Sequence, residues 1–279
     1  MRRLGVDRPG HPRATGMPPE REPALAEEAA RQIPRDVGSV SVTSLFSDWS
    51  YEMVLPVLPF FLAFVRGVTP FLVGVVSGAS EFAQSAIQGV AGARWAHGPE
   101  RKVRGAFGYR ITTVSHGVLA LAVVWPEVLV LRVGAWLGRG SRQPIQSAIV
   151  SNATTPENQG VAFGLEPTMD SLGAVLGTLC AVALVLYGGL RGFREDFALS
   201  VIPGFVAVAV LLVFVQDRAA RAAAGSSPRR AAKWSSFPAR FRWFLIAEVV
   251  FGLGYFGILL ALLRVGEDLL PSAGGLSPR

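Results

Sequence analysis

The chain has 279 residues, of which 51% are hydrophobic and 17% are charged, and its formal net charge is +7. Soluble domains carry about 25% charged residues, so this composition excludes a disordered chain and argues against a soluble globular fold. A single cysteine, Cys180, excludes a disulfide framework, and three scattered histidines leave little for a histidine metal site. We therefore expect no metal and no cofactor.

Residues 1–36 form a separate polar segment. They hold seven arginines, six acidic residues and six prolines, which predicts a solvated, disordered tail rather than a packed unit. The same charges and prolines fill the stretch where the apolar core of a secretory signal would lie. This segment is therefore not predicted to be a signal peptide.

Seven long apolar segments follow at nearly regular spacing. Each is close to the ~20 residues that an α-helix needs to cross ~30 Å of hydrocarbon, and backbone groups in lipid must be satisfied within their own helix. The sequence therefore predicts an all-α, multi-pass transmembrane helix bundle. The predicted segments are residues 40–65, 70–93, 105–125, 127–150, 161–187, 197–215 and 243–263.

The basic residues lie mainly on one side of this predicted bundle. Eighteen lysines and arginines fall in the tail, the loop after the second segment and the linker before the seventh, against three in the loops of the other side. Because basic loops stay in the cytoplasm, we predict a cytoplasmic N-terminus in a cell (inner) membrane. The loop at 151–160 is an exception, since it should be cytoplasmic but has no basic residue. Contact with an anionic leaflet accounts for the positive charge, so the expected partner is the lipid bilayer and not nucleic acid.

The same pattern divides the chain into four parts. We predict a disordered cytoplasmic tail at 1–36, a six-helix unit at 37–215, a basic cytoplasmic linker at 216–242, and a seventh transmembrane helix with a short polar end at 243–279.

Ionisable and polar side chains recur inside the predicted helices, where a charged group at the centre costs ~2.5–3.5 kcal/mol. Those spaced three or four residues apart share one helical face, which is typical of a water-filled path through a bundle. The residues that we assign to a substrate or proton path are Asp48, Glu52, Glu81, Gln84, Arg132, Arg142 and Asp170.

The charges in these helices do not balance, because six acids face four bases. A carboxyl without a countercharge in a low-dielectric site favours its neutral form and can exchange a proton. Asp48, Glu52 and Glu81 are the best candidates, with Arg132 and Arg142 as countercharges. Two alternatives stay open: the acids and arginines lock each other in pairs, or the surplus acids lie near the headgroups and stay solvated.

Three stretches of the chain are similar to sequences of the major facilitator superfamily of secondary transporters, in a bacterial branch. They read SLFSDWSYEMVLPVLP at 44–59, RVGAWLGRGSR at 132–142 and AFGLEPTMDSLGAVLG at 162–177. The resemblance covers about residues 38–265. It implies two six-helix halves, each built from inverted three-helix repeats, with a substrate site between the halves.

The resemblance also implies roles for single residues. Asp48 and Glu52 match the acidic pair of the first helix, Arg132 and Arg142 match the fourth-helix motif, and Asp170 matches the fifth-helix motif. Gly173 and Gly177 match a glycine face that packs against its neighbour and helps to set the alternating-access hinge. In the family, the loop after the second helix reads G-x-x-x-D-R-x-G-R-R/K, and the resemblance implies that this loop acts as a cytoplasmic gating latch. Of that pattern, this chain keeps only Gly92, Arg101 and Lys102.

The chain stops after its seventh predicted segment, whereas the resemblance implies twelve. We expect a proton-coupled secondary transporter that moves a small solute by alternating access, with a homodimer or a missing C-terminal half completing the path. The alternative is a truncated membrane remnant or assembly partner that does not transport. An enzyme is not expected, because the sequence has neither a Gly-x-Ser-x-Gly nor a His-Glu-x-x-His motif.

Overall fold

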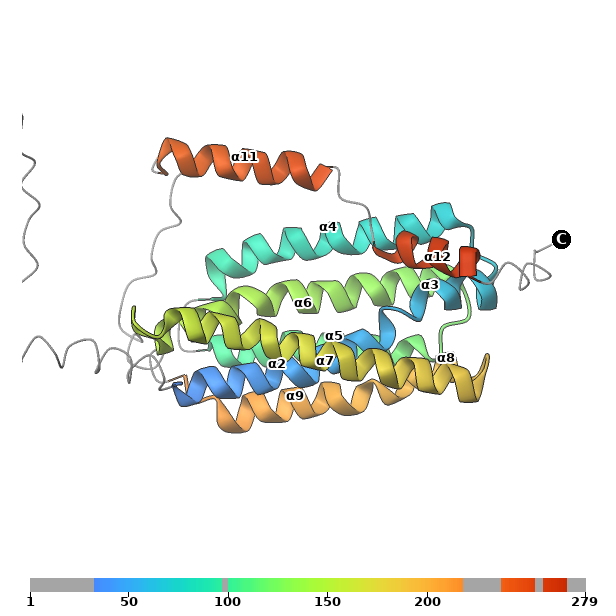
Figure 1. The fold of residues 1–279 in the computed structure, drawn as a ribbon, viewed down its shortest axis with the longest axis horizontal. Helices are drawn as coiled ribbons and strands as arrows, with labels where there is room; N and C mark the ends of the chain where they lie inside the picture. Colours follow the sequence, from blue (N-terminus) through green and yellow to red (C-terminus); the bar gives the residue numbers. More distant parts are fainter. Residues whose placement is uncertain (1–32, 97–99, 218–236, 254–257, 270–279) are drawn as a thin grey trace, which may run out of the picture.

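The computed structural model describes residues 33–96, 100–217, 237–253 and 258–269, and the regular structure in these ranges is helical throughout. The predicted tail up to residue 32, most of the predicted linker and the polar end after residue 269 lie outside the described residues. Most of the helices run side by side along one axis (Figure 1). We call the end of the bundle at which the first described helix begins the tail end, and the opposite end the far end.

The first predicted segment is broken at its prolines, as the sequence indicates. Helix α2 covers Arg35–Val54, and after a turn the chain continues as α3 (Leu58–Phe60) and the π-helical turn η1 (Phe61–Val65). Pro56 and Pro59 lack the amide hydrogen of a continuous helix, and a proline ring clashes with the carbonyl one turn earlier. The break therefore separates α2 from the far end of the segment.

Four long helices match the next four predicted segments. They are α4 (Pro70–Arg94), α5 (Arg101–Leu119), α6 (Trp125–Ala153) and α7 (Gln159–Gly188). The sixth segment is divided into α8 (Gly192–Leu199) and α9 (Val201–Phe214), with Ser200 between them in a helical conformation.

Two helical stretches of the described chain are long and apolar enough to cross a membrane by hydropathy alone, namely α7 and the run of α8 with α9 from Gly192 to Phe214. Polar residues account for the lower hydropathy of other helices. Helix α6, for example, contains three arginines, at 132, 139 and 142.

The seventh predicted segment, residues 243–263, includes four residues that the structure does not describe, 254–257. On either side of them lie α11 (Ala239–Leu253) and α12 (Ile258–Leu269). The expectation of one helix over this segment falls partly outside the described residues and stays a prediction.

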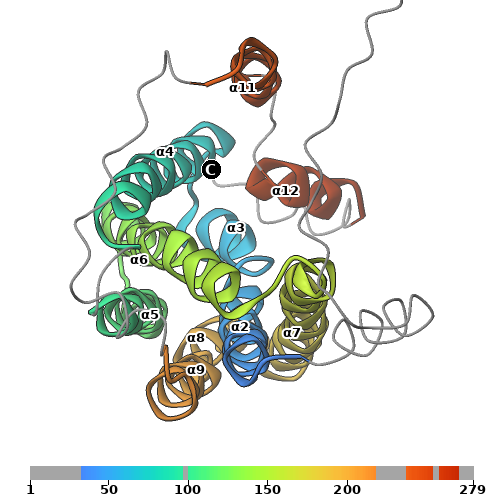
Figure 2. The same cartoon turned by 90° about the vertical axis from the view of Figure 1, so that its left-hand side faces the viewer.

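Helix α6 packs between α4 and α5, while α2 packs against α7 and α9 (Figure 2). The α2–α7 crossing depends on small residues. A Cβ atom added at Gly173 would collide with the carbonyl oxygen of Leu45, and one at Gly177 would come within 2.5 Å of the carbonyl oxygen of Trp49. The backbones of α2 and α7 therefore touch, as the predicted glycine face requires.

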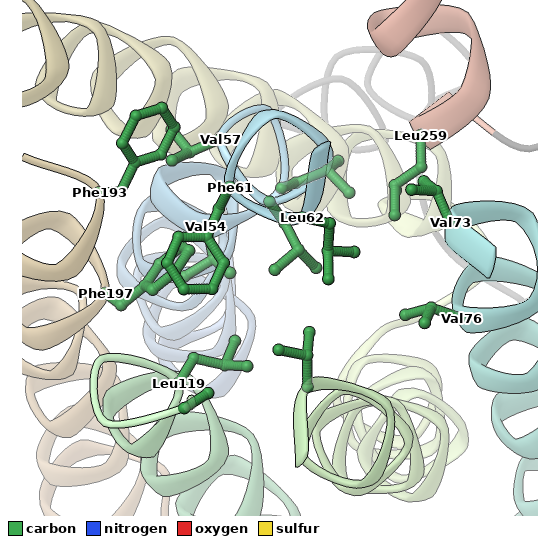
Figure 3. Packing of buried hydrophobic residues seen from close by; sticks show 14 of the residues in the cluster. Val54, Val57, Phe61, Leu62, Val73, Val76, Leu119, Phe193, Phe197 and Leu259 are labelled. Carbon is green, nitrogen blue, oxygen red and sulfur yellow. The ribbon is translucent and has the colours of Figure 1, made fainter. Parts of the chain in front are cut away.

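Two apolar clusters occupy the two ends of the bundle. The far-end cluster surrounds Phe61 and Leu62 and includes Phe193 and Phe197 of α8 (Figure 3). The tail-end cluster includes Tyr109, Ile145 and other residues of α2, α5, α6 and α9. In chain order, Asp48 of α2 and Arg139 and Arg142 of α6 lie between the residues of these two clusters.

Candidate functional site

The centre of the site is Asp48 of α2, which is 8% exposed. The Nη1 of Arg139 donates to its Oδ1 at 3.1 Å, and the Nη2 of Arg142 lies 3.9 Å from the same oxygen. Both arginines come from α6 and are three residues apart, so they project from neighbouring positions on one helical face. One carboxylate thus joins α2 to α6 through two guanidiniums.

Aromatic rings hold both guanidiniums in place. The guanidinium carbon of Arg139 lies 4.2 Å from the ring centre of Tyr51, and that of Arg142 lies 4.1 Å from the ring centre of Tyr109. A cation over a ring face is attracted by the ring's negative charge density. One turn toward the tail end, the Nε2 of Gln146 donates to the Oγ of Ser44 at 2.8 Å, adding a second polar bond between α6 and α2.

Further carboxyls lie close to this pair. Glu52 of α2 is within electrostatic range of Asp48 and Arg139, and Glu166 and Asp170 of α7 are within range of Asp48 and Arg142. All three side chains are partly exposed. We call the group formed by these side chains the Asp48 cluster: Asp48, Glu52, Glu166, Asp170, Arg139 and Arg142. It holds four carboxyls and two guanidiniums.

Arg132, predicted as a countercharge, lies elsewhere. Its guanidinium stacks over the ring of Trp136 at 3.9 Å, and among the described residues it forms no ion pair. Tyr51 connects the two regions, since its ring centre lies 5.1 Å from that of Trp136 and 6.2 Å from that of His116. The close partner of Asp48 is Arg139, which the predicted set of path residues omitted.

The predicted residues of α4 form separate contacts. The Oγ of Ser77 donates to Glu81 at 2.9 Å, and the Nε2 of Gln84 donates to the Oε1 of Gln143 of α6 at 3.1 Å. Among the described residues, neither Glu81 nor Gln84 has a direct bond to the Asp48 cluster. Gln84 thus joins α4 to α6, whereas the Ser77–Glu81 bond lies within α4.

The three predicted latch residues lie in helices rather than in a loop. Gly92 belongs to the last turn of α4, where an added Cβ would lie 3.6 Å from Pro144 of α6. Arg101 and Lys102 open α5. From the N-terminus of α5, Arg101 bonds to Asp217 after α9 and Lys102 bonds to the carbonyl oxygen of Leu212 in α9. The sequence did not predict these contacts.

Arg101 forms a buried ion pair that the sequence did not reveal. Its Nε donates to the Oδ2 of Asp217 at 2.8 Å, its Nη2 contacts Oδ1, and both side chains are at most 5% exposed. Asp36 at the start of α2 accepts from the backbone N–H groups of Gln216 and Asp217 at 2.8 and 3.1 Å. This tail-end clasp joins α2, α5 and the chain after α9 beside a cavity of about 370 Å³. The available signal was an acidic residue two positions after the end of a long apolar segment.

Comparison with known proteins agrees with this architecture. A family model described as the Major Facilitator Superfamily matches residues 40–270. An uncharacterized MFS-type transporter of Methanocaldococcus jannaschii is 25% identical over 243 residues, which are 87% of this chain and 60% of the relative. An uncharacterized protein of Mycobacterium tuberculosis is 26% identical over 175 residues, covering 60% of this chain and 42% of that protein.

Solved structures with a similar fold are also transporters. A peptide transporter POT in complex with sulfate superposes with a TM-score of 0.58 at 18% identity, over 89% of this chain and 55% of that one. A bacterial homologue of the human lysosomal transporter Spinster, inward-facing and unoccupied, gives 0.57 at 16% identity, over 74% of this chain and 46% of that one. These likenesses concern the fold, and they involve transporters rather than enzymes. Since the family model covers most of its length, the chain belongs to the major facilitator superfamily.

Proposed function

We propose that this protein takes part in secondary transport of a small solute across the cell membrane by alternating access, coupled to protons. The observation that carries the proposal is the Asp48 cluster, in which four carboxyls face two guanidiniums across the α2, α6 and α7 contacts. Family membership supports transport in general. The solute class and the coupling ion are parts of our proposal.

The cluster has the properties that coupling requires. If all its groups were ionised, the four carboxyls would leave two negative charges uncompensated, which is costly at low dielectric. Proton uptake by both Glu52 and Asp170 would remove this cost, while Asp48 remains paired with Arg139. A proton or a cationic group of the solute would therefore compete for the same carboxyls, and this competition would link the two movements.

The remaining predicted residues take supporting roles in this proposal. Glu81, Gln84 and Arg132 would line the path beside α6, and Gly173 and Gly177 would form the contact about which α7 moves against α2. Gly92, Arg101 and Lys102 would belong to a gate at the tail end. We place that end in the cytoplasm, in an inner-membrane orientation, and a second copy or another polypeptide would supply the opposite wall of the path.

Transport assays test this proposal directly. The full chain is reconstituted into lipid vesicles, and uptake of labelled amino acids, peptides and sugars is measured with and without an imposed pH gradient. We expect gradient-dependent uptake of at least one solute, its loss on adding a protonophore, and its loss in Asp48→Asn. Glu157→Gln, a change at an exposed carboxyl between α6 and α7, is the matched control and should transport normally. Absence of gradient-dependent flux for every solute class would contradict the proposal.

A second candidate function is that of a membrane subunit that does not transport by itself. The chain spans 60% of the archaeal relative and 42% of the mycobacterial one, so transport by this chain alone needs a test of its own. Native mass spectrometry of the tagged chain, extracted from its host membrane in mild detergent, tests this candidate. A stoichiometric second polypeptide, together with flux only when both are reconstituted, would favour it over transport by the chain alone.

A further inference from the structure

Asp196 is a buried carboxyl outside the site described above. It lies in α8 with 0% of its surface exposed, and neither carboxyl oxygen has a hydrogen-bond partner among the described residues. Buried polar groups are nearly always hydrogen-bonded. A carboxyl with both oxygens unpartnered therefore requires an explanation.

The surroundings of Asp196 are apolar and closely packed. Phe193 and Phe197 of the same helix point into the far-end cluster, where the ring of Phe197 packs edge-on against Phe61 at 5.2 Å (Figure 3). One turn before Asp196, Gly192 lies against the backbone of α7 at Leu184, where an added Cβ would collide. One turn after it, Ser200 is also fully buried. Asp196 is thus on the face of α8 that packs against α5 and α7.

The charged neighbours on α8 are engaged elsewhere. Arg194 donates through Nη1 to the carbonyl oxygen of Ala120 at 2.5 Å and through Nη2 to that of Ala122 at 3.1 Å. Arg66, from the end of η1, donates to the same Ala122 oxygen. Glu195 is exposed. Arg194 and Arg66 are therefore held by the carbonyls after α5, and Arg191, directly before α8, is exposed.

The ionisable groups on the adjoining helices also have other surroundings. On α2, Glu52 and Tyr51 belong to the region of the Asp48 cluster, and on α5 the ring of His116 faces Tyr51. The far half of α7 has Cys180 and Tyr187, the latter 93% exposed, and α9 has no ionisable side chain. The other ionisable residues of α2, α5 and α7 lie toward the tail end or in the cluster. In the part of the chain that the structure describes, Asp196 has no ion pair.

We propose that Asp196 is a proton-binding site, separate from the Asp48 cluster, and that its bound proton allows α8 to pack against α5 and α7. An ionised carboxylate without a partner costs far more to bury than the neutral acid, and lipid around the bundle offers no compensating water. Loss of the proton forces the carboxylate to seek water, which it reaches only when α8 separates from its neighbours. This inference does not depend on the proposed transport function.

Infrared difference spectroscopy tests the protonation state directly. Spectra of the full chain and of its Asp196→Asn variant are recorded at neutral pH in lipid nanodiscs and subtracted, so that the bands of all other carboxyl groups cancel. We expect the difference to contain the C=O stretching band of a protonated acid, shifted in D2O. Glu195→Gln, which removes the exposed neighbour on the same helix, is the matched control and should give the two bands of an ionised carboxylate. Carboxylate bands for Asp196 would overturn the proposal.

Hydrogen exchange tests the link to packing, and its first measurement needs only the wild-type chain, so it decides even if the variant does not fold. After correction for the intrinsic rate, we expect peptides of α8 to lose protection as the pH rises from mildly acidic to alkaline, while peptides of α4 keep theirs. In Asp196→Asn this loss should disappear, and in Glu195→Gln it should persist. Protection of α8 that does not change with pH would overturn the proposed role of the proton.

Discussion

Arg139 and Arg142 direct nitrogen atoms toward the same oxygen of Asp48, whereas Arg132 of the same helix stacks on Trp136. The arginines differ in partner because they lie at different positions along the axis of α6. Arg132 lies seven residues before Arg139, which corresponds to about 10 Å along the helix axis. Residues on one face of a helix can thus have the same charge but entirely different partners, because Asp48 of the neighbouring helix lies at the depth of Arg139 and Arg142.

A double-mutant cycle can verify this assignment. We expect Asp48→Asn and Arg139→Gln to be coupled by roughly 0.5–3 kcal/mol, the range for residues in direct contact. Asp48→Asn and Arg132→Gln should be additive, because no ion pair joins them in the described structure. The measurement is the unfolding free energy of the single and double variants in mixed micelles. Equal coupling for both arginines would contradict the geometry.

The tail-end clasp gives a second prediction for single residues. Arg101→Ala leaves Asp217 buried without its countercharge, and removal of one partner from a buried ion pair costs about 3–5 kcal/mol. Arg104→Ala, one turn later in α5, is the matched control. It breaks only the exposed pair with Glu100, whose side chains are 38% and 71% exposed, and exposed pairs contribute about 0–1 kcal/mol. Thermal unfolding should show a large loss for Arg101→Ala alone, and similar losses for both variants would exclude a stabilising clasp.

At the scale of helices, the α2–α7 crossing depends on the absence of side chains at Gly173 and Gly177. We expect Gly173→Ala to destabilise the protein by about 1–3 kcal/mol, the usual cost of overpacking, because its Cβ meets the backbone of α2. Gly164→Ala in the same helix has open space around it and should be neutral or slightly stabilising, since alanine favours helices. Melting temperatures of both variants provide the measurement. Equal melting temperatures would mean that α2 and α7 can separate without cost.

These helices also indicate what a sequence can predict. Hydropathy and the requirement for satisfied backbone hydrogen bonds predicted the helical segments before the structure. Which side chains pair across two helices was harder to predict from the sequence. The rotation and the axial position of one helix relative to another depend on packing along its whole length. The pairing of Arg139 with Asp48 and that of Asp217 with Arg101 were missed for this reason.

At the scale of the whole molecule, large hydrophobic side chains cover the outside of the bundle while charged ones gather inside it. Phe71, Phe82, Tyr187 and Trp243 are each at least 70% exposed, whereas Asp48, Arg132 and Arg142 are at most 8% exposed. This distribution is the reverse of that in a soluble protein. It fits a bundle surrounded by lipid, in which the apolar exterior faces hydrocarbon chains and the charged side chains are kept away from them.

Orientation in the membrane is the last prediction, and it follows from the excess of basic residues at one side. If the N-terminus is cytoplasmic, the loop between α6 and α7 is cytoplasmic and the turn between α7 and α8 is external. Single cysteines at two exposed positions, Glu157→Cys and Leu190→Cys, test this in a Cys180→Ala background. A membrane-impermeant maleimide added to intact cells should label position 190 only, and position 157 should react only after permeabilisation. The loop at 157 is the stringent site, because it lacks basic residues and so has no positive charge of its own to retain it in the cytoplasm. Labelling of position 157 in intact cells would reverse the topology and place the tail-end clasp outside the cell.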